Sequence, residues 1–141
     1  MSTSQKSSQS PNSGRFEDGE SVDHPKHYTF GGIEVIDVIE GWKLPFHLAN
    51  VIKYVSRAPY KSNFKEDLQK ARWYLDRFVS KCEDSKTFKV NVSPDVPDIA
   101  EVLEAWKIED VALSTIIENV YFSRYDRAIE LLSEVIDEIL G

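Results

Sequence analysis

The sequence predicts an all-α protein made of two degenerate three-helix units that follow a disordered leader. Three observations support this fold class. Apolar residues recur at helical spacing through most of the chain, turn-forming residues separate these stretches, and one block occurs twice. That block reads V-[IL]-E-x-W-K-[LI] and begins at Val38 and again at Val102, an offset of 64 residues. A helical pattern repeated at a fixed spacing indicates two copies of one supersecondary unit.

The first unit contains three predicted helices. The stretch IEVIDVIEGW has apolar residues at helical spacing, and Gly41 is placed to end that helix. Pro45 suits the first turn of the second helix. The third helix begins near Asn63, which with Glu66 resembles a capping box, and runs to about Lys81. The second helix has apolar residues at i, i+3, i+4 and i+7, namely Leu48, Val51, Ile52 and Val55.

A linker and three further helical patterns complete the chain. The linker TFKVNVSPDVP contains alternating apolar residues over 88–92, which allow a short extended segment. The later patterns repeat the earlier ones at offsets of 64, 65 and 57, so the first unit has about eight extra residues between its second and third helices. We therefore predict a leader over 1–22, a first unit over 23–84, a linker over 85–97 and an acidic unit over 98–141.

The leader is predicted to be disordered because it is rich in Ser, Gln, Asn and Gly and almost lacks large apolar residues. The single cysteine, Cys82, excludes an internal disulfide and is compatible with a reducing compartment. No apolar run approaches the roughly 20 residues of a membrane span, and the N-terminus has no apolar signal core. We therefore expect a cytoplasmic protein without a membrane partner.

Charge is distributed unevenly along the chain. The formal net charge of −7 argues against direct, nonspecific nucleic-acid binding by the whole surface. Residues 50–81 carry eight Lys or Arg against three Asp or Glu, whereas residues 95–141 carry three against twelve. An anionic ligand is therefore expected on the first unit.

Polar residues of the first unit gather on helix faces that packing does not need. On a helical wheel, the second helix presents Asn50, Lys53, Tyr54 and Arg57 opposite its apolar stripe. The third helix presents Lys70, Trp73, Arg77 and Lys81, with Tyr74 beside them. With Lys61, these cations suit phosphates, the aromatic rings suit a base, and the Asn50 amide suits a base edge or sugar. The alternative is a solvated basic face whose aromatics pack between subunits. Exposed aromatics and a modest core also lead us to expect a homo-oligomer.

Other chemistries have weaker support. His24 and His27 lie beside Asp23 and could hold a metal only with further ligands, for which His47 is a remote candidate. There is no GxxxxGK[ST] phosphate loop and no zinc-type cysteine cluster. Three carboxylate pairs at helical spacing resemble the Mg²⁺-binding pairs of all-α nucleotide pyrophosphatases: Glu34 and Asp37, Glu101 and Glu104, and Glu134 and Asp137.

Four stretches together resemble a phage-encoded SaV-like domain of unknown function: DHPKHY, GGIEVIDVIEGW, LPFHLANVIKYVSRAPYK and EDLQKARWYLD. The resemblance covers residues 22–80. That family includes phage nucleotide kinases that phosphorylate deoxynucleoside monophosphates without a phosphate loop. The resemblance implies a polar site with these members: Asp23, His24, His27, Tyr28, Asn50, Lys53, Arg57, Lys61, Asp67 and Lys70.

The resulting hypothesis is phosphoryl transfer from ATP or another nucleoside triphosphate, assisted by Mg²⁺, in an infected bacterial host. Lys53, Arg57 and Lys61 would neutralise charge on the transferred group. Asp67 would hold the metal or accept a proton, and His27 is a weaker candidate base. Trp73 or Tyr74 would stack on the base. Three alternatives stay open: a protein that sequesters nucleotides, an all-α nucleotide pyrophosphatase, and a protein that binds a host protein.

Overall fold

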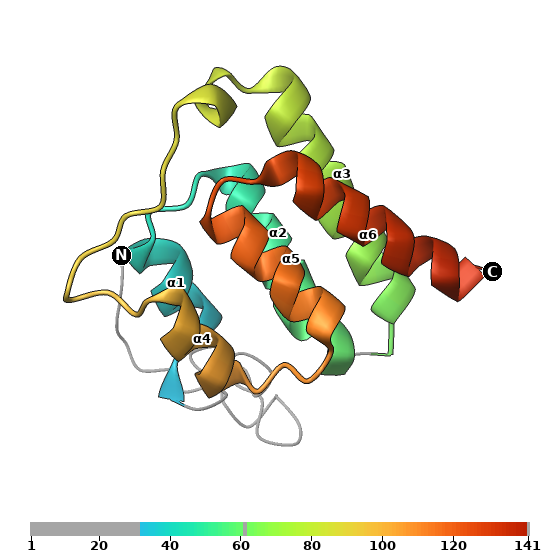
Figure 1. The fold of residues 1–141 in the computed structure, drawn as a ribbon, viewed down its shortest axis with the longest axis horizontal. Helices are drawn as coiled ribbons and strands as arrows, with labels where there is room; N and C mark the ends of the chain where they lie inside the picture. The colour runs from blue at the N-terminus through green and yellow to red at the C-terminus, as the bar shows by residue number, and fades with distance from the viewer. Residues whose placement is uncertain (1–31, 61, 141) are drawn as a thin grey trace, which may run out of the picture.

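The computed structural model describes residues 32–60 and 62–140, which form six α-helices and two short 3₁₀-helices (Figure 1). These described residues contain no β-strand, so the predicted all-α fold is confirmed. The predicted disordered leader lies outside the described residues. The helices are α1 (Val35–Gly41), α2 (Phe46–Arg57), η4 (Ala58–Tyr60), α3 (Phe64–Lys81), η5 (Glu83–Lys86), α4 (Ile99–Trp106), α5 (Val111–Tyr121) and α6 (Tyr125–Leu140).

The two predicted units bury equivalent positions. The tryptophans of the duplicated block, Trp42 and Trp106, are both buried, and the residues after them, Lys43 and Lys107, both adopt left-handed backbone conformations with φ of 59° and 51°. Offsets of 65 and 57 relate further buried pairs: Leu48 and Leu113, Val51 and Ile116, Ile52 and Ile117, Val55 and Val120, Ala71 and Ala128, and Leu75 and Leu132. The repeated apolar residues therefore serve packing in both halves.

The tryptophans also connect the two units reciprocally. Trp42 Nε1 donates a hydrogen bond to the carbonyl oxygen of Pro97 (2.8 Å), and Trp106 Nε1 donates to that of Ile33 (2.7 Å). Each indole thus fixes the segment that leads into the first helix of the other unit. Buried indole N–H groups require such partners, because an unpaired buried donor is costly.

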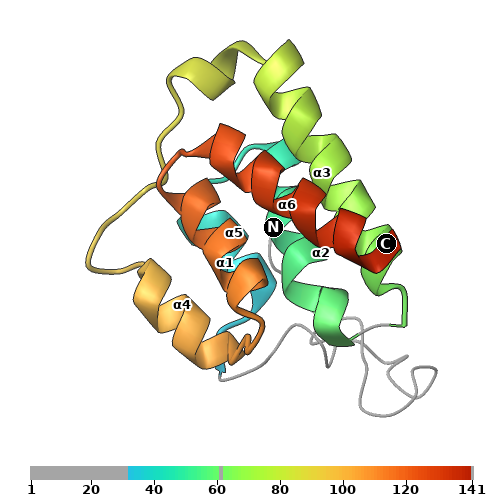
Figure 2. The ribbon, with the colours of Figure 1, turned by 45° about the vertical axis from the view of Figure 1, so that its right-hand side comes forward.

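The six helices enclose one continuous core rather than two separate ones. Buried side chains from both units belong to the same apolar cluster. The α2–α3 pair and the α5–α6 pair each form a helical hairpin, and the hairpins pack through contacts of α2 with α5 and of α3 with α6 (Figure 2). Either unit alone would expose the apolar residues that the other covers.

The linker is anchored to the end of α1 and forms no strand over 88–92. The backbone N–H of Asn91 donates to the carbonyl oxygen of Trp42 (3.1 Å), and Asn91 Nδ2 donates to that of Gly41 (2.8 Å). These bonds satisfy carbonyls at the C-terminus of α1. A Cβ at Gly41 would lie 3.0 Å from Val96 Cγ1, so glycine permits the linker to approach this closely.

One predicted local motif is wrong. Asn63 is the N-cap residue of α3, but its side chain makes no capping hydrogen bond, so the expected capping box with Glu66 does not form. A capping box forms instead at α4, where the Asp98 and Glu101 side chains each accept a 2.9 Å bond from the other's backbone N–H. The sequence pattern alone did not show which of these two helix starts forms the capping hydrogen bonds.

Candidate functional site

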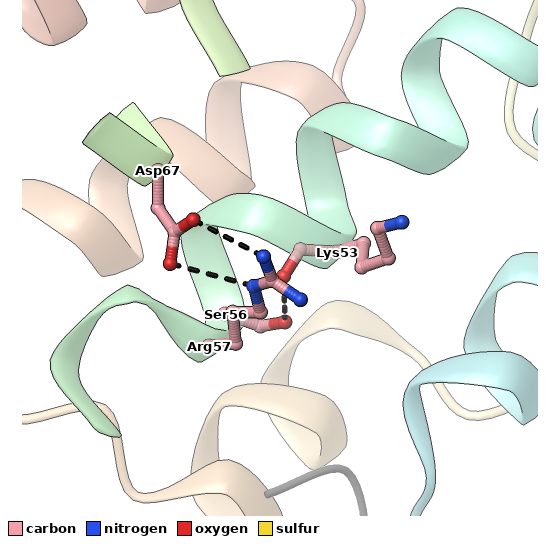
Figure 3. A network of polar contacts seen from close by, with 4 residues as sticks. All are labelled: Lys53, Ser56, Arg57 and Asp67. Carbon is pink, nitrogen blue, oxygen red and sulfur yellow. Dashed lines mark hydrogen bonds and ion pairs between the residues drawn. The ribbon is translucent and has the colours of Figure 1, made fainter. Parts of the chain in front are cut away.

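A buried ion pair joins the end of α2 to the first turn of α3. Figure 3 shows the guanidinium of Arg57 facing the carboxylate of Asp67. Arg57 Nη2 lies 3.3 Å from Asp67 Oδ1, and Arg57 Nε lies 3.4 Å from Asp67 Oδ2. The Asp67 side chain is only 2% exposed, compared with 22% for Arg57. A carboxylate this deeply buried needs a cationic partner, so the pair holds the two helix ends in register.

Three cationic side chains converge on the ring of Tyr54. The Nζ of Lys53 lies 4.8 Å from the ring centroid, the Cζ of Arg57 4.9 Å, and the Nζ of Lys70 5.5 Å. Among the described residues, these three cations and the Asp67 carboxylate carry a net charge of +2. The structure therefore brings together the cations that the helical wheels placed on two different helices.

The pKa of Lys53 reflects this crowding. Partial burial lowers it from the ordinary value of 10.5, and the positive charges of Arg57 and Lys70 lower it further. The negative charge of Asp67 acts in the opposite direction but does not cancel these effects. A bound anion would stabilise the protonated amine of Lys53 and so offset the repulsion among the three cations.

An aromatic strip continues from Tyr54 along both helices. The Tyr54 and Tyr74 rings stack, with centroids 6.1 Å apart and planes at 16°. Tyr74 then contacts Trp73 (5.1 Å) and Phe46 (5.9 Å) at steep angles. Phe46 and Trp73 remain exposed, at 68% and 57%. The predicted Trp73 and Tyr74 thus adjoin the cations.

The sequence reasoning missed Phe46. It lies four residues before Asn50 and eight before Tyr54, on the same stripe of α2. Its spacing to these predicted residues was the signal that could have found it. Asn50 itself lies on this stripe, and its Nδ2 donates to the carbonyl oxygen of Phe46 (3.0 Å).

The structure does not describe several of the residues predicted to form the site. His24, His27, Tyr28 and Lys61, together with Asp23, lie outside the described residues, and their roles stay predictions. His47 is described, and its Nδ1 lies 3.7 Å from the Sγ of Cys82 at the end of α3. His47 also contacts the Phe78 ring at 6.3 Å, so it belongs to the far end of the hairpin from Arg57.

The described residues do not supply a set of ligands for Mg²⁺. Both carboxylate oxygens of Asp67 accept hydrogen bonds from Arg57. Within residues 32–60 and 62–140, no group of three or more His, Cys, Asp or Glu side chains is arranged to hold a metal ion. Asp67 alone does not fit such a site, and we assign no reaction step through the ion to these residues.

At least one carboxylate of each pair has a structural partner. Asp37 Oδ2 accepts from the backbone N–H of Glu34 (3.3 Å) at the start of α1, and Glu101 caps α4. Glu134 Oε2 lies 3.9 Å from Arg127 Nη1 on α6. Helix capping and surface ion pairing therefore account for acidic residues that the pyrophosphatase alternative would use.

The comparison with protein families found a match over the part of the chain that contains α1, α2 and most of α3. Residues 22–76 match a family model described as a protein of unknown function (DUF3310). The matched stretch includes Arg57, Asp67 and the aromatic strip, whereas α4, α5 and α6 lie outside it. No curated protein and no solved structure matches the chain. Among the described helices, none is both long and apolar enough to cross a bilayer.

Proposed function

We propose that this is a phage-encoded nucleotide kinase that binds a deoxynucleoside monophosphate on the α2–α3 face and phosphorylates it from a nucleoside triphosphate. The supporting observation is the convergence of Lys53, Arg57 and Lys70 on the Tyr54 ring, with one carboxylate among them. Crowded cations beside exposed aromatic rings match the two parts of a nucleotide, its phosphate and its base.

In this proposal the cations have distinct roles. Lys53 and Lys70 bind phosphate oxygens through charge-assisted hydrogen bonds, each contributing about 1.5–3 kcal/mol. Asp67 fixes the guanidinium of Arg57, which stabilises negative charge as the phosphoryl group moves. Lys61 stays a candidate for neutralising charge on the transferred group, and His27 stays a weaker candidate base.

The reaction itself is a direct displacement. A phosphate oxygen of the monophosphate forms a bond to the γ-phosphorus of the donor. The bond between that phosphorus and the β–γ bridging oxygen breaks, and the nucleoside diphosphate leaves. Mg²⁺ would arrive with the triphosphate. The protein's contribution is positioning and charge stabilisation, because this reaction needs little covalent participation by side chains.

Nucleotide sequestration without turnover is the second candidate. It is favoured by the cations and the aromatic strip, because these suffice for binding without any reaction. The exposed rings of Phe46 and Trp73 also leave room for a homo-oligomer or a host-protein contact.

Product analysis separates these functions. The protein is incubated with radiolabelled ATP, Mg²⁺ and each deoxynucleoside monophosphate, and the products are resolved. A new deoxynucleoside diphosphate supports the kinase, and binding without product supports sequestration. Release of pyrophosphate, or the absence of any nucleotide binding, would contradict the proposal.

Matched lysine variants locate the activity. Lys70→Ala should lose most of the turnover or binding, whereas Lys65→Ala removes an exposed lysine of the same helix that lies off this face and should behave as the wild type. Equal losses in the two variants would mean that general surface charge, rather than this cluster, attracts the nucleotide.

A further inference from the structure

The α2–α3 face, which carries the cations around Tyr54 and the aromatic strip, has different chemistry at its two ends. The helices run antiparallel, because Arg57 pairs with Asp67 at one end, while His47 meets Phe78 and Cys82 at the other. The charged cluster therefore lies toward the Arg57 end of the face. The exposed rings of Phe46 and Trp73 lie on the side of the face toward the start of α2.

These two ends are separated by about the length of a nucleotide. Phe46 precedes Lys53 by seven residues, which is about 10 Å along a helix that rises 1.5 Å per residue. Seven residues are close to two full turns, so both side chains lie on the same stripe of α2. The phosphate and the far edge of the base in a nucleoside monophosphate are separated by a comparable distance.

We propose that the nucleoside monophosphate lies lengthwise on this face, with its phosphate at Lys53 and Lys70 and its base against Phe46 and Trp73. This inference rests on the proposed function and adds the orientation of the ligand and a base-contacting residue, Phe46. Tyr74 contacts both exposed rings and stacks on Tyr54, so it holds the rings of Phe46 and Trp73 in position.

The charge at the phosphate end fits a monophosphate. The cluster of Lys53, Arg57, Lys70 and Asp67 has three positive groups and one negative group, a net charge of +2. A phosphate monoester carries about −1.5 to −2 at pH 7. The charge of these four described residues thus matches the acceptor monophosphate, which is the ligand that we place on this face.

Asn50 lies between the two ends, one turn from both Phe46 and Lys53. Its Nδ2 donates to the carbonyl oxygen of Phe46, which fixes the orientation of the amide. The amide oxygen is then an acceptor placed to meet the sugar or an amino group of the base.

Self-association through two copies of this face would also cover the exposed rings, but the charge on the face opposes that symmetric contact. Two copies that meet through the same face would bring two clusters of net charge +2 together, and Arg77, whose Cζ lies 5.8 Å from the Trp73 ring centroid, adds a further cation. Like charges at an interface without counter-charges are unfavourable. An aromatic ligand with an acidic end satisfies both the rings and the cations.

The test compares two ligands and two matched variants. NMR titrations measure the affinities of a deoxynucleoside monophosphate and of 2-deoxyribose 5-phosphate, which lacks the base. Phe46→Ala removes the ring from the first position of α2. Val111→Ala alters the equivalent first position of α5, where the side chain is 75% exposed, and is the control.

We expect Phe46→Ala to weaken nucleotide binding about tenfold, the scale of one base–aromatic stack, and to leave the sugar phosphate affinity unchanged. Phe46→Trp should retain nucleotide binding, and Val111→Ala should match the wild type. The orientation is wrong if Phe46→Ala leaves nucleotide affinity unchanged or weakens both ligands equally. It is also wrong if that variant only changes the oligomeric state measured by light scattering.

Failure of the proposed function has a different signature. A wild-type protein that binds neither ligand contradicts nucleotide binding itself, and the orientation falls with it. A wild-type protein that binds the sugar phosphate and the nucleotide equally well retains a phosphate site, while the base contact with Phe46 and Trp73 is refuted.

Discussion

The two three-helix units share their packing and differ on their outer faces. The positions of Arg57 and Asp67 in the first unit correspond to Phe122 and Arg124 in the second, at offsets of 65 and 57. An ion pair joins the helices in the first unit, whereas Arg124 Cζ lies 4.9 Å above the Phe122 ring in the second. The fold therefore accepts different chemistry at this junction, so packing alone does not explain the ion pair.

Charges near this junction also differ. Lys53 corresponds to Glu118, and Lys70 corresponds to Arg127. Arg127 Nη1 lies 2.9 Å from Glu130 on its own helix, whereas Lys70 lies over Tyr54 beside two other cations. Positive charge is compensated locally in the second unit and is concentrated in the first. The two units therefore differ in charge where they agree in packing, and the proposed ligand site lies on the unit with the concentrated cations.

The largest expected effect comes from breaking the ion pair. Asp67→Ala leaves the guanidinium of Arg57 mostly buried without its carboxylate, and the free energy of unfolding should fall by about 3 kcal/mol. Arg124→Ala at the equivalent position is the control and should cost less than about 1 kcal/mol, since the pair it removes is exposed. Urea unfolding measures both. Equal losses would show that the two junctions are energetically alike.

A double variant sharpens the same comparison. Arg57→Phe with Asp67→Arg copies the second unit's residues into the first and replaces the ion pair by a cation–π contact. Its unfolding free energy should be no higher than that of Asp67→Ala, because position 67 is buried whereas Arg124 is exposed, so the new guanidinium is buried without a counter-charge. A double variant as stable as the wild type would show that the two junctions are interchangeable.

The reciprocal tryptophans provide an intermediate effect. Trp42→Phe and Trp106→Phe each remove an indole N–H and leave a carbonyl oxygen, of Pro97 or Ile33, without that bond. Each should lower the unfolding free energy by about 1–3 kcal/mol. Similar losses measured by thermal unfolding would confirm that the units are equivalent in packing, whereas a loss in only one variant would contradict it.

The smallest expected effect is a pH dependence due to Lys53. Its pKa in the folded protein is below the ordinary 10.5 because of partial burial and then Arg57 and Lys70. The protonated amine therefore destabilises the fold at neutral pH, and this cost disappears as the pH rises from the folded pKa toward 10.5. Relative to Lys53→Met, the wild type should gain stability over that range. A constant difference between the two proteins would contradict the crowding of cations.

Much of the fold was predictable because it depends on local periodicity. The apolar stripe of α2, the end of α3 at Lys81 and the tryptophan repeat follow from residues near each other in the chain. The hydrogen bond between Asn91 and Gly41 could not be predicted from local periodicity, because it joins residues 50 positions apart in the sequence. The incorrect capping box at Asn63 shows that a local motif needs the right backbone geometry as well as the right letters.

The candidate site was predictable only in part. The helical wheels identified Lys53, Tyr54 and Lys70, but each wheel describes one helix, and the pairing across the hairpin depends on tertiary packing. The pairing of Asp67 with Arg57 could not be predicted in this way, and the metal-binding or proton-accepting role of Asp67 stays a prediction. Phe46 was missed because its exposure follows from the fold.

The most direct test of the central claim exchanges one charge between the units. Isothermal titration calorimetry measures the binding of a deoxynucleoside monophosphate to the wild type, to Lys53→Glu and to Glu118→Lys. If the first unit's cations bind the phosphate, Lys53→Glu should weaken binding at least about a hundredfold, since it removes one charge-assisted contact and adds repulsion, and Glu118→Lys should match the wild type. Unchanged binding in Lys53→Glu, or an equal change in both variants, would contradict the account.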